Sequence, residues 1–190
     1  MYEYVAFERQ YGSGGQEIAT KLARRLGYQL YDRGVLVETC KRMDMDYTYI
    51  AKLDETAPSK LFFRSPGSTL SLEEQIFETE KVILREAAEK PGCIFVGRCA
   101  SEVLKDKKVL RVFVTADDEY RLERAINVED FPPDEAEGMM RKIDKRREKF
   151  FNAHAGNNWR SPEFFDVILN SGRLGIDACV DLLEGIVRKA

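Results

Sequence analysis

The stretch YGSGGQEIA, Tyr11–Ala19, decides the fold of this chain. It follows the apolar segment YEYVAF, Tyr2–Phe7, which is typical of a β-strand, and it leads into apolar residues at helical spacing. Glycines let the backbone curl so that several N–H groups point into one concavity, where a helix N-terminus adds positive potential. Strand, glycine-rich turn and helix in this order predict a phosphate-binding loop. A tight turn that only allows close packing of strand and helix is the alternative.

The predicted loop departs from the consensus G-x-x-x-x-G-K-[ST]. When Gly14 is placed on the second glycine, Gly15 falls on the lysine. Arg9 then falls on the first glycine, and Gln16 on the hydroxyl residue. The usual phosphate-binding cation and magnesium ligand are therefore missing from their places. We predict that Arg9, at the loop entrance, partly replaces the lysine, because a guanidinium can grip phosphate with two hydrogen bonds.

The phosphate contacts should come from the residues of the turn itself and the start of the helix. They are Gly12, Ser13, Gly14, Gly15, Gln16 and Glu17. The sequence does not identify the magnesium ligands: Ser13, Asp32 or an acid near the third strand could hold the ion through water.

Composition points to an ordinary globular protein. The chain has 190 residues, of which 44% are hydrophobic and 33% charged, and this length fits one domain over 1–190. A net charge of −3 gives no general attraction for nucleic acid or for an anionic membrane. No apolar run nears the ~18 residues that a membrane helix needs. We expect a cytoplasmic protein whose partners are small-molecule nucleotides, with a homo-oligomer left open.

Cysteine and histidine usage argues against metal or disulfide chemistry. Cys40, Cys93, Cys99 and Cys179 show no CxxC spacing, so buried, reduced thiols are expected, with disulfides or a metal site as the alternative. The single histidine, His154, is expected in a loop or lid rather than as a ligand.

Short apolar strands alternate with amphipathic helices, which predicts an α/β fold around a parallel sheet of about five strands. A capping box formed by Ser71 and Glu74 should begin a long helix that runs to about Glu89. A charged helix is expected over Glu135–Asn152, after a hinge-like break. The strands are expected at Tyr2–Phe7, Tyr28–Asp32, Cys93–Gly97, Val109–Ala116 and Phe164–Asn170.

Five motifs in this order resemble the cytidylate kinase-like branch of the P-loop nucleoside monophosphate kinases. They are YGSGGQEIATKLARRLGYQLYDR, IFVGRCA, VFVTADDEYRLERAI, RKIDKRREKF and DVILNSGRLGIDACVDLL, and they cover nearly the whole chain except Met43–Ser71. The resemblance implies a P-loop NTPase-type three-layer sandwich with a helical acceptor-binding part over 33–90 and a helical lid over about 128–160. It also implies ATP and Mg²⁺ as cofactors and a nucleoside monophosphate, CMP or dCMP, as acceptor.

The resemblance also suggests roles for residues outside the loop. Arg98, in the Gly-Arg of IFVGRCA, would bring its charge to the acceptor, and it lies where open α/β sheets place ligands. Arg141 and Arg147 would contact phosphate, and Asp144 the acceptor ribose. Each could instead be structural: Arg98 as a surface arginine, and the others as part of a solvated helix face.

Asp32 and Arg33 follow the second strand, so they could contact the acceptor at the same edge of the sheet. Asp32 could equally cap the next helix. Arg121 and Arg124 could reach phosphates from the lid side or be ordinary helix charges. Three functions remain open at this point: a kinase for a nucleoside monophosphate, a kinase for another small acceptor, and a non-catalytic nucleotide-binding protein. Nucleic-acid binding is disfavoured by the net charge.

Overall fold

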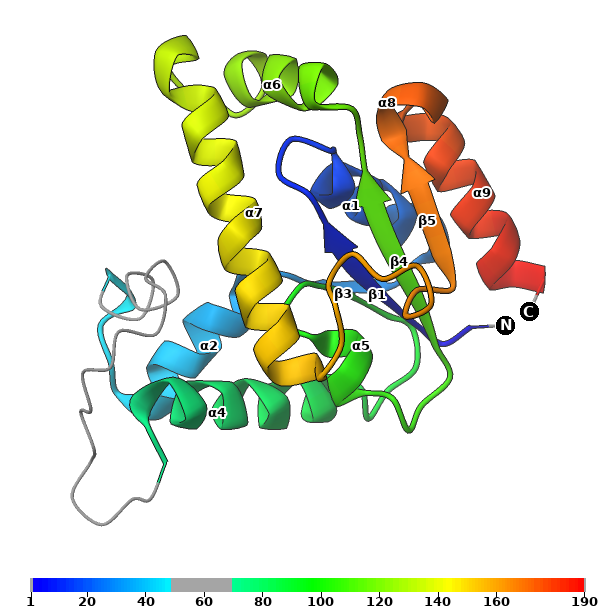
Figure 1. Cartoon of the computed structure of the whole chain (residues 1–190). Helices are drawn as coiled ribbons and strands as arrows, with labels where there is room; N and C mark the ends of the chain where they lie inside the picture. The colour runs from blue at the N-terminus through cyan, green and yellow to red at the C-terminus, as the bar shows by residue number, and fades with distance from the viewer. Residues whose placement is uncertain (1, 49–69, 190) are drawn as a thin grey trace.

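The computed structural model describes residues 2–48 and 70–189, which form a parallel sheet with helices on both faces (Figure 1). The strand order is β2-β3-β1-β4-β5, and every neighbouring pair is parallel. The expected α/β fold with about five parallel strands is confirmed. The strands are β1 (Tyr4–Arg9), β2 (Gln29–Tyr31), β3 (Cys93–Val96), β4 (Val109–Thr115) and β5 (Val167–Asn170).

The helices cover most of the remaining described chain. The capping box at the start of α4 is present, since the Ser71 hydroxyl accepts from the Glu74 N–H and the Glu74 carboxylate accepts from the Ser71 N–H. Two single turns, α5 and α8, were not predicted, because four residues are too few to show a periodic pattern. The helices are α1 (Gly15–Leu26), α2 (Gly34–Met43), α4 (Leu72–Ala87), α5 (Ala100–Val103), α6 (Asp118–Asn127), α7 (Pro133–Ala155), α8 (Ser171–Leu174) and α9 (Ile176–Lys189).

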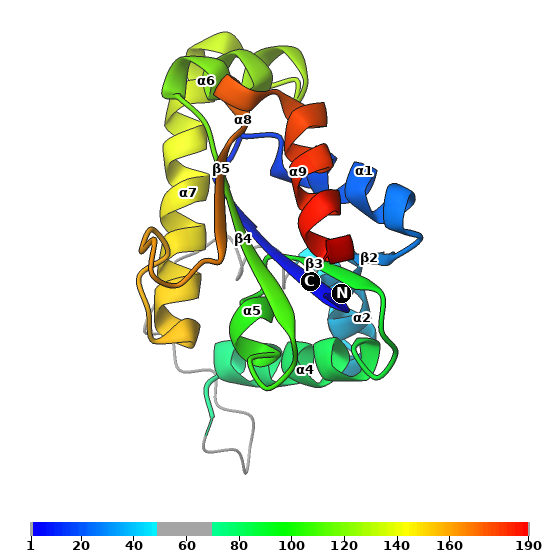
Figure 2. The same ribbon diagram turned by 90° about the vertical axis from the view of Figure 1, so that its right-hand side faces the viewer.

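Alternating residues of β1 fill the cores on both faces of the sheet. Val5 and Phe7 pack into a cluster with apolar residues of α1 and α9. Tyr4 and Ala6 face the other way, into a cluster built with α4, α5 and the end of α7. Figure 2 shows the sheet between α9 and α1 on one side and α7 on the other. The side-chain alternation of a strand therefore produces the predicted three layers.

The first strand extends further than the pattern indicated. The expected strand stopped at Phe7, whereas β1 continues to Arg9, because Glu8 and Arg9 pair in register with β4 as far as Val114. Arg9 is thus the last residue of a central strand and not part of the loop. The paired backbone of β1 therefore sets the position of the Arg9 Cβ atom. The last strand, β5, begins at Val167 and not at Phe164 as expected, because Phe164 and Phe165 turn into the core.

The helix α7 runs across the front of the sheet (Figure 1). Its first turns pack against α6, and its last turns enter the core, where Phe151 is 1% exposed. His154 lies in this last part, not in a loop, and stacks on Phe77 of α4 with ring centroids 3.7 Å apart. Of Met43–Ser71, the stretch outside the five motifs, residues 49–69 lie outside the described residues. The acceptor part over 33–90 and the lid over 128–160 stay predictions.

All four cysteines are described, and each is a buried free thiol, as expected. Among the described helices, none combines the length and the apolar character that a membrane crossing requires.

Leu22 of α1 is fully buried against the sheet, in the core cluster that joins α1 to α9. We expect Leu22→Ala to lower the free energy of unfolding by about 3 kcal/mol, through lost burial and the cavity left behind. Chemical denaturation followed by circular dichroism measures this loss. Leu182→Ala in α9, where the side chain is 49% exposed, is the matched control and should cost less than about 1 kcal/mol. Equal losses would contradict the described packing.

Candidate active site

The glycine-rich turn has the backbone shape of an anion site. Gly12 and Gly14 have positive φ angles of 73° and 71°, which glycine adopts without strain. Gly14 is the N-cap residue of α1, which begins at Gly15. The first N–H groups of α1 have no acceptor within the helix, and they carry its positive dipole end. The backbone therefore offers donors where the sequence predicts phosphate.

The loop's own side chains are engaged with protein groups. The Ser13 hydroxyl donates to Gln10 O at 2.8 Å, and Ser13 O accepts from the Ser171 hydroxyl at 2.5 Å. The Gln16 amide donates to Asp32 Oδ2 at 2.8 Å, and Glu17 pairs with Arg124 at 2.9 Å. If the loop binds phosphate as predicted, its backbone N–H groups are therefore the donors to expect. The phosphate role of these six residues remains a prediction.

Arg9 reaches from the end of β1 across the edge of the sheet. Its Cβ and Cγ lie against Gly15, the first residue of α1, and its Nη1 lies against Gly97, directly after β3. Burial lowers the pKa of the Arg9 guanidinium, and the charges of Arg98 and Arg33 act in the same direction, while Glu8 and Asp32 oppose it. The side chain therefore crosses the region between the loop and the neighbouring strand, among other arginines.

Arg98 is held in place from two helices. Its Nη1 lies 3.1 Å from Glu80 Oε1 of α4, and its guanidinium lies 5.6 Å from the centroid of the Phe150 ring of α7. The side chain is 16% exposed and that of Glu80 is fully buried. Arg98 also has a φ of 58°, a strained value for a residue with a side chain. This is not the arrangement of a solvated surface arginine, and its acceptor role stays a prediction.

Arg147 joins this group from α7. Its Nη1 donates to Arg9 O at 3.0 Å, and its guanidinium lies 5.6 Å from the centroid of the Tyr11 ring. Burial lowers the pKa of Arg147, and the nearby charge of Arg9 lowers it further. The structure therefore brings together three predicted residues from distant parts of the chain at the carboxyl ends of the central strands. They are Arg9, Arg98 and Arg147.

Glu8 is a buried carboxyl under this arginine group that the sequence analysis did not select. It is 5% exposed, and its Oε2 accepts from the indole Nε1 of the fully buried Trp159 at 3.2 Å. Burial raises the pKa of Glu8, while the charges of Arg9, Arg147 and Arg98 lower it. Because the apolar pattern of the strand ends at Phe7, nothing in the sequence indicated that Glu8 would be buried.

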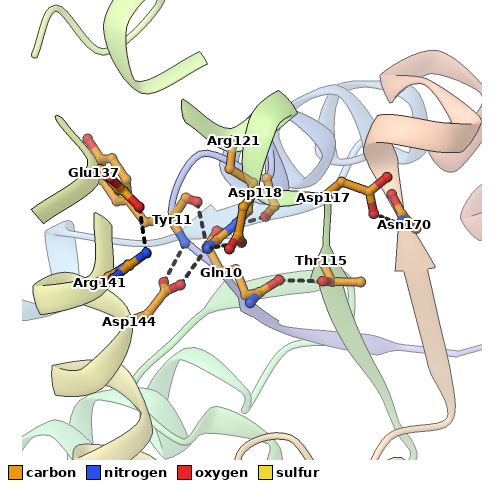
Figure 3. Close-up of polar contacts among 11 residues, drawn as sticks. Gln10, Tyr11, Thr115, Asp117, Asp118, Arg121, Glu137, Arg141, Asp144 and Asn170 are labelled. Atoms are coloured by element: carbon orange, nitrogen blue, oxygen red, sulfur yellow. Dashed lines mark hydrogen bonds and ion pairs between the residues drawn. The ribbon is translucent and has the colours of Figure 1, made fainter. Parts of the chain in front are cut away.

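Asp144 and Arg121 form a buried ion pair that fastens the loop to α6 and α7 (Figure 3). Asp144 Oδ1 accepts the Tyr11 N–H at 2.7 Å, while Arg121 Nη1 donates to Tyr11 O at 3.1 Å and pairs with Asp144 Oδ2. Both side chains are 5% exposed. Side chains of α7 and α6 thus hold the N–H and the carbonyl of Tyr11. With both Asp144 oxygens engaged, its predicted ribose contact stays untested.

The remaining predicted residues have other neighbours or are exposed. Arg141 is 72% exposed and pairs with Glu137 one turn earlier on α7. Arg33 is exposed at the start of α2, although its charge acts on Arg9. Arg124 lies beside the loop, where its Cζ would be 3.5 Å from a Cβ on Gly14. Asp32 accepts from Gln16 and, at 3.3 Å, from the Gly34 N–H, so it faces the loop and begins the turn into α2.

The donors near the loop suit magnesium held chiefly by phosphates. Magnesium in kinases takes one or two carboxylates together with phosphate oxygens and waters. Across 2–48 and 70–189, no group of three or more His, Cys, Asp or Glu side chains could form a metal site made of protein alone. Asp32, tied to Gln16 at the start of α1, fits the role of a single carboxylate.

The buried Asp144–Arg121 pair gives a stability test. Asp144→Asn leaves the Arg121 charge buried without a full counter-charge, so we expect the free energy of unfolding to fall by about 3 to 5 kcal/mol. Asp118 pairs with the same arginine at 2.9 Å, but its side chain is 81% exposed. Asp118→Asn, the matched control, should cost less than about 1 kcal/mol. Urea denaturation measures both, and similar losses would show that the buried pair does not fasten the loop.

Solved structures with a similar fold span the whole length of this chain. A structure of an uncharacterized protein from Eubacterium ventriosum superposes with a TM-score of 0.77 at 23% identity, covering 98% of this chain and 99% of that one. Shikimate kinase from Bacteroides thetaiotaomicron gives 0.61 at 15% identity, covering 99% of each chain. Shikimate kinase from Acinetobacter baumannii in complex with shikimate gives 0.57 at 16%, covering 99% of this chain and 94% of that one.

These structural similarities show the fold. No curated protein matches the chain. The family model of the cytidylate kinase-like family matches residues 4–173, which include the loop, the arginine group, α6 and α7. The chain belongs to the cytidylate kinase-like family.

Proposed function

We propose that the protein transfers the γ-phosphoryl group of ATP to a nucleoside monophosphate, CMP or dCMP. One observation carries the proposal: Arg9, Arg98 and Arg147 gather at the carboxyl edge of the sheet, beside the start of α1. Like charges repel, and the protein nevertheless brings these three together, with the buried carboxyls Glu8 and Glu80 beside them. A bound polyanion would lower their mutual repulsion further.

Phosphoryl transfer requires such an arrangement more than it requires a nucleophilic side chain. The reacting oxygens must be held in line, and positive groups must stabilise the charge of the transferred group. In this proposal the N–H groups at the start of α1 hold the ATP phosphates, Arg98 holds the acceptor phosphate, and Arg9 and Arg147 lie between them. Mg²⁺, with Asp32 as its carboxylate through water, would neutralise charge on the ATP phosphates.

The main competing function is binding without transfer, and the specific observation behind it is Gly15 in the place of the lysine. A kinase for another small acceptor is the third candidate, because two of the similar structures are shikimate kinases. We favour transfer because the arginine group supplies the charge that the loop lacks. The buried free thiols agree with the reducing cytoplasm as the place of action.

A panel of acceptors separates these functions. With ATP and Mg²⁺, ADP release should be fastest with CMP or dCMP, slower with UMP and AMP, and near background with shikimate. A coupled spectrophotometric assay measures release. Turnover with shikimate alone would place the acceptor elsewhere. No turnover with any acceptor, together with a higher melting temperature in ATP, would make this a nucleotide-binding protein without transfer.

Arg98 tests the acceptor end of the site. Arg98→Lys keeps a cation for the buried Glu80 carboxylate, so the variant should fold, but it loses the two-pronged grip of a guanidinium. We expect the KM for CMP to rise about 10-fold or more, with the KM for ATP within about twofold of wild type. Initial-rate kinetics give both values.

The matched control is Arg85→Lys, an exposed arginine on α4, which should change neither KM. A rise in the KM for ATP alone, or no change for CMP, would move Arg98 out of the acceptor site.

A further inference from the structure

Two positions that flank the loop have exchanged their residue types relative to the consensus motif. The pattern G-x-x-x-x-G-K-[ST] has glycine at its first position and lysine directly after its second glycine. In this chain the first position is Arg9 and the lysine position is Gly15. The chain thus carries a basic residue and a glycine at the same two positions, in the opposite order.

The structure shows why these positions cannot both carry a side chain. A Cβ added to Gly15 would lie 2.6 Å from Arg9 Cβ and 3.0 Å from Arg9 Cγ. The backbone of a central strand sets the position of Arg9 Cβ, so rotation of the side chain, which moves only Cγ and the atoms beyond it, cannot relieve the overlap with Cβ. A side chain at 15 therefore requires a glycine at 9, and a side chain at 9 requires a glycine at 15.

A second glycine makes room for the charged end of Arg9. A Cβ on Gly97 would lie 2.5 Å from Arg9 Nη1, and the φ of Gly97 is 78°. The guanidinium therefore lies against the backbone at the end of β3, directly before Arg98. Gly15 accommodates the stem of Arg9 and Gly97 accommodates its head, so the side chain has a defined path across the edge of the sheet.

We propose that Arg9 is the phosphate-binding cation of the loop moved to the opposite end of the motif, with Gly15 and Gly97 as the glycines that admit it. The proposal rests on the proposed function for its ligand, the β- and γ-phosphates of ATP. The loss of the lysine is then a relocation of charge from the start of α1 to the end of β1. With this backbone, a side chain at position 9 and a side chain at position 15 exclude each other, so only one of the two positions can carry the cation.

The central experiment exchanges the two residues back. Wild type, Arg9→Gly, Gly15→Lys and the double variant are each measured for melting temperature without nucleotide and for affinity toward a nonhydrolysable ATP analogue. Arg9→Gly should weaken analogue binding about 10- to 100-fold through loss of a charged hydrogen-bond donor. Gly15→Lys should lower the melting temperature by about 5 °C or more through overpacking. The double variant should recover both quantities.

The matched control is Arg9→Ala combined with Gly15→Lys. Alanine keeps the Cβ that lies 2.6 Å from the added Cβ at 15, so this variant should stay as unstable as Gly15→Lys alone. Recovery with glycine and not with alanine supports the exchange. Effects that simply add in the glycine double variant, or equal recovery with alanine, would overturn it.

Arg9→Met keeps the test decisive if Gly15→Lys does not fold. Methionine preserves the stem in its path without the charge, so the melting temperature should stay near that of wild type while analogue binding weakens about 10-fold. Unchanged analogue affinity would overturn the proposal. None of these measurements uses turnover, so a protein without activity on any acceptor would refute the proposed function and leave the exchange to be judged by binding alone.

Discussion

The buried ion pair between Asp144 and Arg121 is the interaction on which the geometry of the site depends. It joins α7 to α6, and the two side chains also hold the N–H and the carbonyl of Tyr11 at the entrance of the loop. A Cβ on Gly12 would lie 2.4 Å from Arg121 O, so the loop passes directly beneath α6. Breaking a buried pair leaves a charge without compensation, which is costly. The loop, α6 and α7 are therefore held in fixed positions relative to one another.

Arginines gathered at the carboxyl ends of the strands repel one another, so nearby acids must offset this repulsion when no ligand is bound. The fold supplies them from beneath: Glu8 in β1, held by Trp159, and Glu80 in α4, paired with Arg98. Both carboxyls are buried, one on a strand and one on a helix. They reduce the repulsion among the arginines. A cluster of positive groups held in place before a ligand binds is what phosphoryl transfer requires.

Much of the fold could be predicted because it follows from local pattern. The alternation of apolar strands and amphipathic helices, the glycine turn and the Ser71–Glu74 capping box are all encoded within a few residues of one another. The end of β1 could not be predicted in this way. Glu8 and Arg9 look like loop residues in the sequence, and only pairing with β4 keeps them in the sheet.

For the site, the sequence by itself determined the glycine turn, the absence of its lysine, and the presence of Arg9, Arg98 and Arg147 on segments that a kinase would use. Only the tertiary structure decided which of them meet. It placed these three together, left Arg141 exposed beside Glu137, and engaged Asp144 with the loop. The physical reason is that spacing along a helix or strand fixes the direction of a side chain, whereas its partners come from other elements, as when Arg147 donates to the carbonyl of Arg9.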